Sequence, residues 1–543
     1  MANVKFDRKS FEREIGKLDE VMQEKIALFG TPVEKIDQDI VELEIFPNRP
    51  DLLGYHGFKR SFLSFLGNKT GLKIYKLNKP EKNYEVKVDP SVKDVRPFTA
   101  CAIVKGLKFD DSKIKEIVEI QEKLHATIGR QRKKLAIGIY PLEEISLPIT
   151  YKALEPDKIK FKPLESPREM SGLEILQKHP TGKDYAHLLT GKMKFPIFID
   201  NDENILSMPP IINSEKTGRV TSRTKDVFIE CSGFDFEILK KCLNIIVTNL
   251  AEMGGKIYQM KVKDKITPDF EPEKMSISIE RANGLLGLDL NEKEMKVCLE
   301  KMGYDYKNGQ VEIPSWRMDI LHEVDLIEDI AIAYGYDNFN PIIPEISTTG
   351  SENKRETLKK KFAELLIGLG LLELSSYHLA KKDDQLINMG FSEKDNIRFV
   401  ELEESKTDYN IMRKELSPSL LKIISENSDS EYPQKIFELG RVFYFDEEKK
   451  IIEKEKLCSL LAPGNFTDLK QILDYLFLNI GLEFKIEEEE NQSFVEGRVG
   501  KIIFEGKKIG IIGEIHPKIL RNWKIKVPIS LFEIDLEKLF EKF

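Results

Sequence analysis

The sequence predicts a multidomain α+β protein, and three observations support this fold class. The chain has 543 residues, enough for about three or four domains that each bury a hydrophobic core. Hydrophobic residues make up 41% of the chain and charged residues 32%, which is ordinary for a globular protein. Short alternating runs, typical of strands, are interspersed with amphipathic runs typical of helices along the whole length.

Composition also limits the function. The chain has 84 Lys and Arg residues against 92 Asp and Glu, a net charge of −8 with a pI near 5.7, which disfavours a dedicated, sequence-independent nucleic-acid binder. We expect no transmembrane helix, because no run of about 18 apolar residues exists. The five scattered cysteines include no C-x-x-C pair, which argues against structural zinc and disulfides. A cytoplasmic location is expected.

A first domain is expected to span residues 1 to about 83. A charged amphipathic segment runs from Asp7 to Phe29, and a strand is expected at Ile40–Phe46. The string Pro47–Asp51 contains two prolines and predicts a rigid turn. We expect Asp51 to cap a helix over Leu52–Leu66.

Residues 84–262 predict an α/β region. Strands are expected at Tyr84–Val88, Thr99–Val104, Lys134–Ile139, Phe195–Ile199 and Asp226–Glu230, with helices at Lys113–Ile128 and Phe236–Met253. A basic cluster at His125–Lys134 is consistent with either helix-dipole complementation or phosphate contact. The segment Met208–Phe234 places dense polar groups between apolar runs, as either a surface hairpin or a binding loop does.

Residues 263–345 are bounded by prolines and predict a small domain. The expected order is strand, helix, helix, strand, helix, with segments at Met275–Ile279, Ile279–Leu286, Glu292–Met302, Val311–Ile313 and Val324–Tyr336. Asn291 is expected to cap the helix that begins at Glu292.

An acidic cluster lies around the start of the last of these helices and is formed by Asp319, Asp325, Glu328 and Asp329. Asp325, Glu328 and Asp329 fall in one arc of the helix, opposite a predicted core stripe of Val324, Ile327, Ile330, Ala331 and Tyr334. Negative charge in a first helical turn suits the helix dipole, and the same oxygens suit Mg²⁺. Carboxylates this close repel one another and need a metal cation or an Arg or Lys partner nearby. The spacing of the acids does not decide between an acidic helix terminus and a Mg²⁺ site.

Residues 346–543 predict an α+β domain with an antiparallel sheet. A helix is expected over Asn353–Leu369, followed by three distinctive strings at Tyr409–Leu421, Lys435–Phe445 and Ile509–Pro517. No G-x-G-x-G-x-x-R run is present, and Gly368–Gly370 is followed by no arginine.

The segment Arg317–Ala331, R-x-D-I-x-x-E-x-D-L-I-E-D-I-A, resembles the signature of phenylalanyl-tRNA synthetase β subunits. The string Pro47–Asp51 resembles the opening of the short archaeal and eukaryotic form of that family. The segment Met208–Phe234, taken with Gln121–Tyr140, resembles its editing domain, and the three C-terminal strings resemble its last domain. The resemblance covers essentially the whole chain in the family's order.

The resemblance implies four domains: an N-terminal domain at 1–83, an α/β editing domain at 84–262, a winged-helix-like domain at 263–345, and a degenerate class II synthetase-like domain at 346–543. It implies an α2β2 complex that attaches phenylalanine to tRNA(Phe) with ATP, with synthesis on the α subunit. The acids Asp319, Asp325, Glu328 and Asp329 would hold Mg²⁺ shared with α, and Arg413 would brace either the fold or an interface. The oligonucleotide-binding and anticodon modules of the longer bacterial β subunits are not expected, so anticodon reading would rely on this body or on the α subunit.

The resemblance also implies that this chain hydrolyses tyrosyl-tRNA(Phe). A pocket that hydrogen-bonds the tyrosine hydroxyl rejects phenylalanine, because its polar groups would otherwise stay unpaired. Glu215 with Asn213 and Ser214 is the expected recognition set, and Glu230 is a weaker candidate. Two rivals remain: a scaffold or tRNA-binding protein with a degraded editing site, and a Mg²⁺-dependent hydrolase that uses the acidic cluster.

Overall fold

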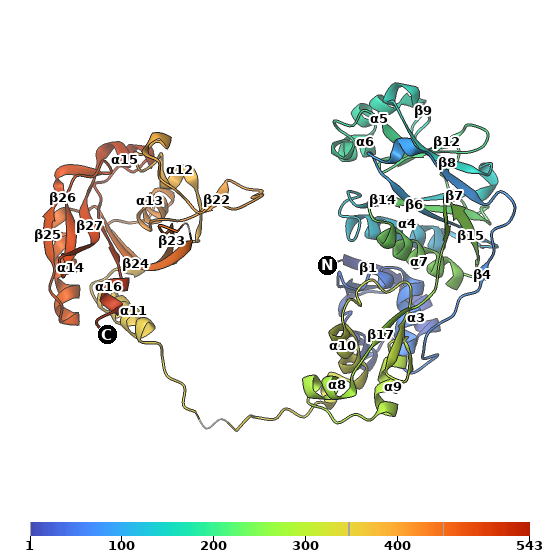
Figure 1. Cartoon of the computed structure of the whole chain (residues 1–543), viewed down its shortest axis with the longest axis horizontal. Coiled ribbons are helices and arrows are strands. Elements are labelled where there is room, and N and C mark those ends of the chain that lie inside the picture. Colours follow the sequence, from blue (N-terminus) through green and yellow to red (C-terminus); the bar gives the residue numbers. More distant parts are fainter. Residues whose placement is uncertain (1, 346–347, 449) are drawn as a thin grey trace. The chain divides into compact units, whose positions relative to one another are not determined.

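The computed structural model describes residues 2–345, 348–448 and 450–543. The chain divides into two compact units, Met1–Ile342 and Ile343–Phe543, and each is described by itself (Figure 1). The mixed α/β, multidomain class expected from the sequence is confirmed. Within the described residues, no helix has the length and apolarity needed to cross a membrane.

The first unit begins with a small three-stranded sheet of order β1-β3-β2, formed by Ala2–Asp7, Ile40–Ile45 and Val33–Ile36. The expected helical segment Asp7–Phe29 is two helices, α1 (Arg8–Glu14) and α2 (Glu20–Leu28). Their side-chain caps are Asp7, which accepts from Ser10 N, and Asp19, which accepts from Met22 N. The two caps and the left-handed Gly16, at φ 147°, explain the break.

The expectation that Asp51 caps the following helix is wrong. The turn continues as a 3-10 segment, Pro50–Leu52, and helix α3 (Tyr55–Phe65) begins after Gly54. Both carboxylate oxygens of the buried Asp51 are instead held by Arg49, at 2.9 Å each. A buried carboxylate is better compensated by a bidentate guanidinium than by one backbone N–H.

A large mixed sheet follows, with order β13-β12-β11-β8-β5-β15-β6-β14-β7. The strands that frame the site below are β6 (Phe98–Lys105), β14 (Val227–Gly233) and β7 (Leu135–Pro141). The others are β5 (Glu85–Val88), β8 (Ile149–Leu154), β11 (Phe195–Ile199), β12 (Ile205–Met208), β13 (Ile212–Asn213) and β15 (Lys256–Val262), with β4 (Leu77–Asn78) and β16 (Lys265–Thr267) paired to β15.

Helices α4 (Asp111–Ala126) and α7 (Phe236–Glu252) cover one face of this sheet, over β6, β14 and β7 (Figure 1). All five strands and both helices expected between residues 84 and 262 are present within a few residues. A small lobe adds β9 (Lys160–Phe161), β10 (Met170–Ser171), α5 (Gly172–Lys178) and α6 (Pro180–Tyr185), with its own apolar cluster.

The next segment has a three-stranded sheet of order β17-β19-β18, from Glu273–Ser276, Gln310–Ile313 and Asp305–Lys307. Its helices are α8 (Ile279–Leu286), α9 (Glu292–Lys301) and α10 (Glu323–Tyr334), as expected apart from the missed β18. Asn291 caps α9 in a capping box, which confirms that prediction. On α10 the core stripe is Leu326, Ile327, Ile330 and Ala331. Val324 is 40% exposed, so its expected core position is wrong.

The second unit is built on a sheet of order β20-β23-β24-β28-β27-β26-β25, antiparallel except at β20. Its strands are β20 (Leu372–Glu373), β23 (Gln434–Phe445), β24 (Ile451–Ala462), β25 (Lys485–Glu488), β26 (Phe494–Phe504), β27 (Lys507–Ile515) and β28 (Ser530–Asp535). The antiparallel sheet expected for this region is confirmed.

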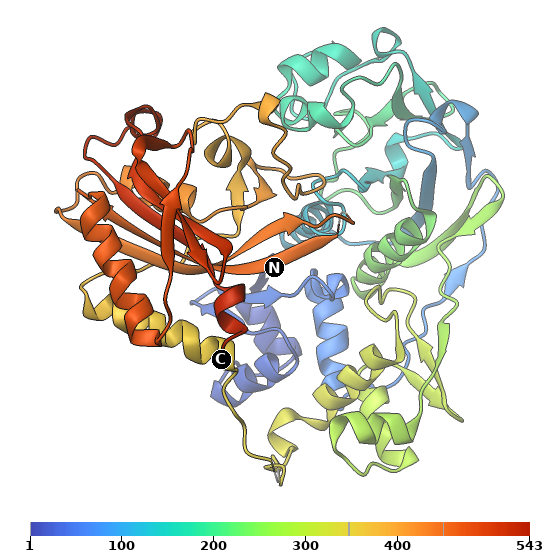
Figure 2. The same cartoon turned by 60° about the vertical axis from the view of Figure 1, so that its left-hand side comes forward.

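Helices lie on both faces of that sheet. Helices α11 (Lys354–Gly368) and α14 (Phe466–Ile480) share one apolar cluster with it, and Figure 2 shows them beside the strands in yellow and orange. The other cluster contains α13 (Ser417–Glu426) and α15 (Pro517–Asn522). Smaller elements are the hairpin of β21 (Leu379–Lys381) with β22 (Tyr409–Met412), α12 (Lys382–Gln385) and α16 (Glu537–Phe540).

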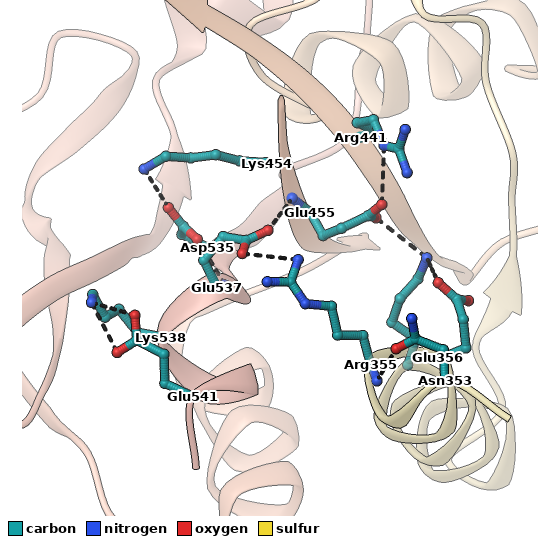
Figure 3. A network of polar contacts seen from close by, with 11 residues as sticks. Asn353, Arg355, Glu356, Arg441, Lys454, Glu455, Asp535, Glu537, Lys538 and Glu541 are labelled. Atoms are coloured by element: carbon teal, nitrogen blue, oxygen red, sulfur yellow. Dashed lines mark hydrogen bonds and ion pairs between the residues drawn. The ribbon is translucent and has the colours of Figure 1, made fainter. Parts of the chain in front are cut away.

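Ion pairs fasten α11 to the sheet and to the last helix (Figure 3). Arg355 lies 3.2 Å from Glu537, and Lys359 lies 3.3 Å from Glu455. Glu455 also pairs with Arg441 at 3.2 Å and donates its backbone N–H to Glu537. A shared network of this kind contributes more than isolated exposed pairs, which typically contribute about 0–1 kcal/mol each.

Candidate functional site

The first candidate site is a cavity of about 420 Å³ in the first unit. Its walls come from α4 and the loop that follows it, from β7 and β14, from the turn at Pro209–Asn213, and from the lobe of α5 and α6. Ligand pockets usually fall between about 300 and 1,000 Å³ and are apolar with a few convergent polar groups. The lining fits that description, because many of its residues are Ile, Val, Leu and Pro.

A polar cluster lies at the base of this cavity. The buried hydroxyl of Tyr140 donates to Ser207 Oγ at 2.7 Å and lies 3.2 Å from Glu230 Oε1 and 3.4 Å from Asn213 Oδ1. Glu230 and Asn213 line the cavity. Gly138 faces Glu230 across the antiparallel pairing of β7 and β14. The four polar side chains come from four strands, so no local motif in the sequence marks them together.

Glu230 is the buried acid of the cluster. It is 1% exposed, and its Oε2 has no hydrogen-bond partner among the described residues. Burial raises the pKa of Glu230 to about 8, although the charge of Arg96 and the Tyr140 hydroxyl oppose the shift. At neutral pH the carboxyl group is therefore largely protonated, and it can both donate and accept a hydrogen bond.

The basic cluster at His125–Lys134 contributes to the cavity wall. Arg132 donates to Ile211 O at 2.9 Å and pairs with Glu122 at 2.8 Å. His125 Nε2 accepts the Ile137 N–H at 2.8 Å, and burial lowers the pKa of His125, so its ring is neutral. These contacts give His125 and Arg132 a bracing role.

The structure separates the four expected editing residues. Asn213 and Glu230 line the cavity, whereas Ser214 and Glu215 are not among its lining residues. Glu215 accepts the Glu165 N–H at 2.9 Å and pairs with Arg219 at 2.9 Å, and the first of these contacts is the main reason its pKa is lowered. Tyr140 and Ser207 were not predicted. The one available signal was a lone acid, Glu230, within the apolar strand Val227–Gly233.

The second candidate site is the acidic cluster at α10, which is organised by a buried arginine. Arg317, 2% exposed, holds both oxygens of Asp319 at 2.8 and 2.7 Å, and its Nη2 also lies 2.8 Å from Asp329. The Tyr304 hydroxyl donates to the same oxygen of Asp329. Arg317 is thus the arginine partner within the chain that compensates the charges of Asp319 and Asp329.

The remaining acids of this cluster differ in what they can still bind. One oxygen of Asp325 accepts the backbone N–H groups of Leu321 and His322, both at 2.7 Å. Glu328 is exposed and accepts no hydrogen bond from the described residues. Partial desolvation of its carboxylate, together with the charges of Asp329, Asp325 and Asp319, raises its pKa.

This donor set fits Mg²⁺ only in part. Glu328 and the second oxygens of Asp325 and Asp329 are free of protein donors within the described residues, whereas Asp319 is fully paired with Arg317. Across residues 2–345, 348–448 and 450–543, no group of three or more His, Cys, Asp or Glu side chains is arranged to hold a metal ion. A hard cation at this site would therefore need oxygen ligands from outside this chain.

In the second unit, Arg413 has the bracing role predicted for it. It is 1% exposed, pairs with Glu438 at 2.6 Å, and donates to Ser376 Oγ and Arg441 O at 2.7 Å each. These contacts tie the end of β22 to β23. Glu438 is itself buried, so the pair is internal to the domain.

Comparison with known proteins defines the class first: the chain is a subunit of an aminoacyl-tRNA synthetase. Residues 340–536 match the family model of the phenylalanyl tRNA synthetase beta chain CLM domain, and residues 275–336 match the tRNA synthetase B5 domain. The chain belongs to the family of phenylalanine–tRNA ligase β subunits, which confirms the resemblance found in the sequence.

The relatives match over nearly their full length. The chain is 41% identical over 507 residues to the phenylalanine–tRNA ligase beta subunit of Thermococcus sibiricus, covering 91% of this chain and 90% of that protein. It is 36% identical to the subunit of Archaeoglobus fulgidus, covering 98% and 97%. A crystal structure of an N-terminal fragment of the phenylalanyl-tRNA synthetase beta subunit from Pyrococcus horikoshii matches at 38% identity and a TM-score of 0.59, covering 61% of this chain and 99% of the fragment.

Proposed function

We propose that this chain acts with an α subunit, in an α2β2 complex, to attach phenylalanine to tRNA(Phe) with ATP. The names of its relatives support the ligase activity and the need for a partner subunit. Synthesis is assigned to α. The domains proposed are 1–83, 84–262 for editing, 263–345 in a winged-helix-like fold, and 346–543 as a degenerate class II synthetase-like domain.

We propose that the ester of tyrosyl-tRNA(Phe) is hydrolysed in the 420 Å³ cavity, which releases tyrosine. The observation that carries this is the buried, unpartnered Oε2 of Glu230 beside the Tyr140 hydroxyl, in an otherwise largely apolar pocket. A phenol hydroxyl placed there would pair with Glu230, whereas a phenyl ring would leave it unpaired. An unpaired buried polar group costs about 1–3 kcal/mol. Sites built to bind a hydroxyl reject the analogue that lacks it by a factor on the order of 10⁴.

The chemistry of the hydrolysis is assigned to water. No pair of nucleophile and base lies at the base of the cavity among the described residues: the Tyr140 hydroxyl is engaged with Ser207, and His125 is engaged with Ile137 and Glu122. Asn213, which lines the cavity, would orient the substrate. This chain's residues therefore select the amino acid and exclude bulk water, and a positioned water attacks the ester carbonyl carbon.

The test is deacylation of tyrosyl-tRNA(Phe) and of phenylalanyl-tRNA(Phe) by the full complex, wild type against Tyr140→Phe. We expect the wild type to hydrolyse the tyrosyl ester in clear preference. In Tyr140→Phe the tyrosyl rate should fall at least tenfold, because Glu230 loses its neighbour, while phenylalanylation is unchanged. Absence of deacylation in the wild type would favour the rival, a scaffold or tRNA-binding protein with a degraded editing site.

We also propose that Glu328, with the free oxygens of Asp325 and Asp329, contributes to a Mg²⁺ site completed by the α subunit. Asp319 then serves to hold Arg317. The bound ion would link the two subunits electrostatically. Glu328→Gln should weaken the Mg²⁺-dependent association of α and β at least tenfold, as measured by analytical ultracentrifugation across a Mg²⁺ titration. Asp337→Asn, an exposed acid just beyond α10, is the matched control. Equal Mg²⁺ dependence in both variants would contradict this assignment.

A further inference from the structure

A second cavity, of about 320 Å³, lies in the first unit and shares Arg317 with the acidic cluster described above. It is formed by α3, the loop that follows it, the ends of α7 and α9, and the segment after β19. Six cationic side chains line it: Arg49, Lys59, Arg60, Lys69, Lys73 and Arg317. Glu14 and Glu252 are its lining carboxylates. We refer to it as the basic cavity.

Two of the arginines are part of the buried framework. Arg49 is 9% exposed and Arg317 is 2% exposed, and each is held by aspartates that do not line the cavity. The two guanidinium groups are close enough for their charges to repel each other. These side chains are fixed before any ligand arrives, so a ligand that binds them loses little affinity to ordering.

Arg60 is held by a different kind of contact. Its guanidinium stacks over Trp316, 4.3 Å from the ring centroid, and its Nη1 donates to the Tyr75 hydroxyl at 3.0 Å. No carboxylate lies within ion-pair distance of Arg60 or of Lys69 among the described residues. By contrast, Lys59 pairs with Glu14 at 2.7 Å and Lys73 with Glu252 at 2.5 Å. Arg60 and Lys69 therefore have no direct ion-pair partner among the described residues.

Three guanidinium nitrogens in this region are buried without a hydrogen-bond partner in the described structure: Arg60 Nε, Arg60 Nη2 and Arg317 Nη1. Buried polar groups are nearly always paired, and an unpaired charged donor is the costliest kind. Three unpaired donors beside one cavity need an acceptor with several oxygens. The guanidinium fork matches phosphate and carboxylate geometry, and the excess of cations favours a group with more than one negative charge.

We propose that the basic cavity binds the phosphate group of a small anionic ligand, with Arg60 and Arg317 as principal donors and Lys69 at the rim. Inorganic phosphate, pyrophosphate and the phosphate end of a nucleotide share this chemistry. Arg49 contributes positive charge from the wall. Neither Glu230 nor Glu328 lines this cavity, so the proposal does not depend on their assigned roles, although the cavity shares Arg317 with the acidic cluster.

The test is isothermal titration calorimetry of the full-length chain, in magnesium-free buffer at low ionic strength, with phosphate, pyrophosphate, ATP and adenosine. We expect pyrophosphate and ATP to bind and phosphate to bind more weakly. Adenosine should not bind. Tighter binding of ATP than of pyrophosphate would identify a nucleotide, and equal binding would identify the inorganic ion. Arg60→Gln should weaken binding at least tenfold and Lys69→Gln about threefold.

The matched control is Lys76→Gln, which removes one positive charge from an exposed residue that does not line the cavity. Lys69 is exposed and makes no ion pair among the described residues, so Lys69→Gln should fold normally even if Arg60→Gln does not. The proposal is overturned if phosphate and pyrophosphate do not bind at millimolar concentration, or if Lys69→Gln and Lys76→Gln bind pyrophosphate equally well. It is also overturned if only tRNA binds in an Arg60-dependent manner, because that result assigns the site to the RNA backbone.

Discussion

Gly138 leaves the space in which Glu230 and Tyr140 meet. The two residues Gly138 and Glu230 are direct partners in the pairing of β7 with β14. A Cβ atom at position 138 would lie 2.1 Å from the Tyr140 hydroxyl oxygen and 2.7 Å from Glu230 Oε1. Both separations are shorter than any real Cβ contact, so the polar cluster depends on the missing side chain.

The first prediction concerns this glycine. Gly138→Ala should displace Tyr140 from Glu230 and lower tyrosyl-tRNA(Phe) deacylation at least tenfold, with phenylalanylation unchanged. Overpacking of this kind also costs about 1–3 kcal/mol of stability. Rates of both reactions in the full complex check the result. Gly284→Ala, on α8 with open space around it, is the control and should change neither rate. Undiminished deacylation in Gly138→Ala would mean that the cluster is not the recognition site.

The second prediction is a pH dependence of stability that arises from Glu230. Its pKa in the folded protein, about 8, lies above its ordinary value of 4.5, so the folded state binds a proton more tightly than the unfolded state. The resulting stabilisation is fully present below pH 4.5 and is lost as the pH rises through about 8. Between pH 5.5 and 8.5 this amounts to at most about 3 kcal/mol.

Glu230→Gln, an isosteric mimic of the protonated acid, should remove this dependence. The melting temperature of the variant relative to wild type should rise as the pH is raised from 5.5 to 8.5. Differential scanning calorimetry of the full chain measures the trend for the first unit. Glu143→Gln, an exposed acid in the same domain, should follow the wild type throughout. Parallel wild-type and Glu230→Gln curves would show that Glu230 does not titrate in this range.

The third prediction concerns the arginine beneath the acidic cluster. Arg317→Met leaves Asp319 and Asp329 buried without their cation, which typically costs about 3–5 kcal/mol. The first unit should therefore melt several degrees lower. Arg281→Met breaks a pair with Glu323 in which the arginine side chain is 54% exposed, and should cost about 0–1 kcal/mol. Similar losses of stability in the two variants would show that the Arg317 pairs contribute no more to stability than the Arg281–Glu323 pair.

The sequence predicted the elements well where local signals decide them. The capping box at Asn291 and the bounds of α8 and β11 are specified by nearby residues. The helix cap expected at Asp51 failed because a bidentate arginine two residues earlier competes for that carboxylate. Local rules do not weigh such tertiary partners against a backbone N–H.

The candidate site was harder to predict, because its members come from separate strands. Glu215 lies in the most polar loop and therefore drew attention, yet it does not line the cavity and is paired with Arg219, which does. Tyr140 and Ser207 lie 67 positions apart in the chain and meet only through the order of the sheet. By contrast, the acidic cluster could be predicted because its four acids lie within one turn and one helix, although its partner Arg317 was not assigned in advance.

The most direct test of the account compares two glutamates in the full complex with the α subunit. Tyrosyl-tRNA(Phe) deacylation is measured for wild type, Glu230→Ala and Glu215→Ala, with phenylalanylation measured in parallel. We predict that Glu230→Ala loses deacylation by at least tenfold while Glu215→Ala keeps it within about threefold, and that all three retain phenylalanylation. Loss in Glu215→Ala with full activity in Glu230→Ala would contradict the account and move recognition to the loop.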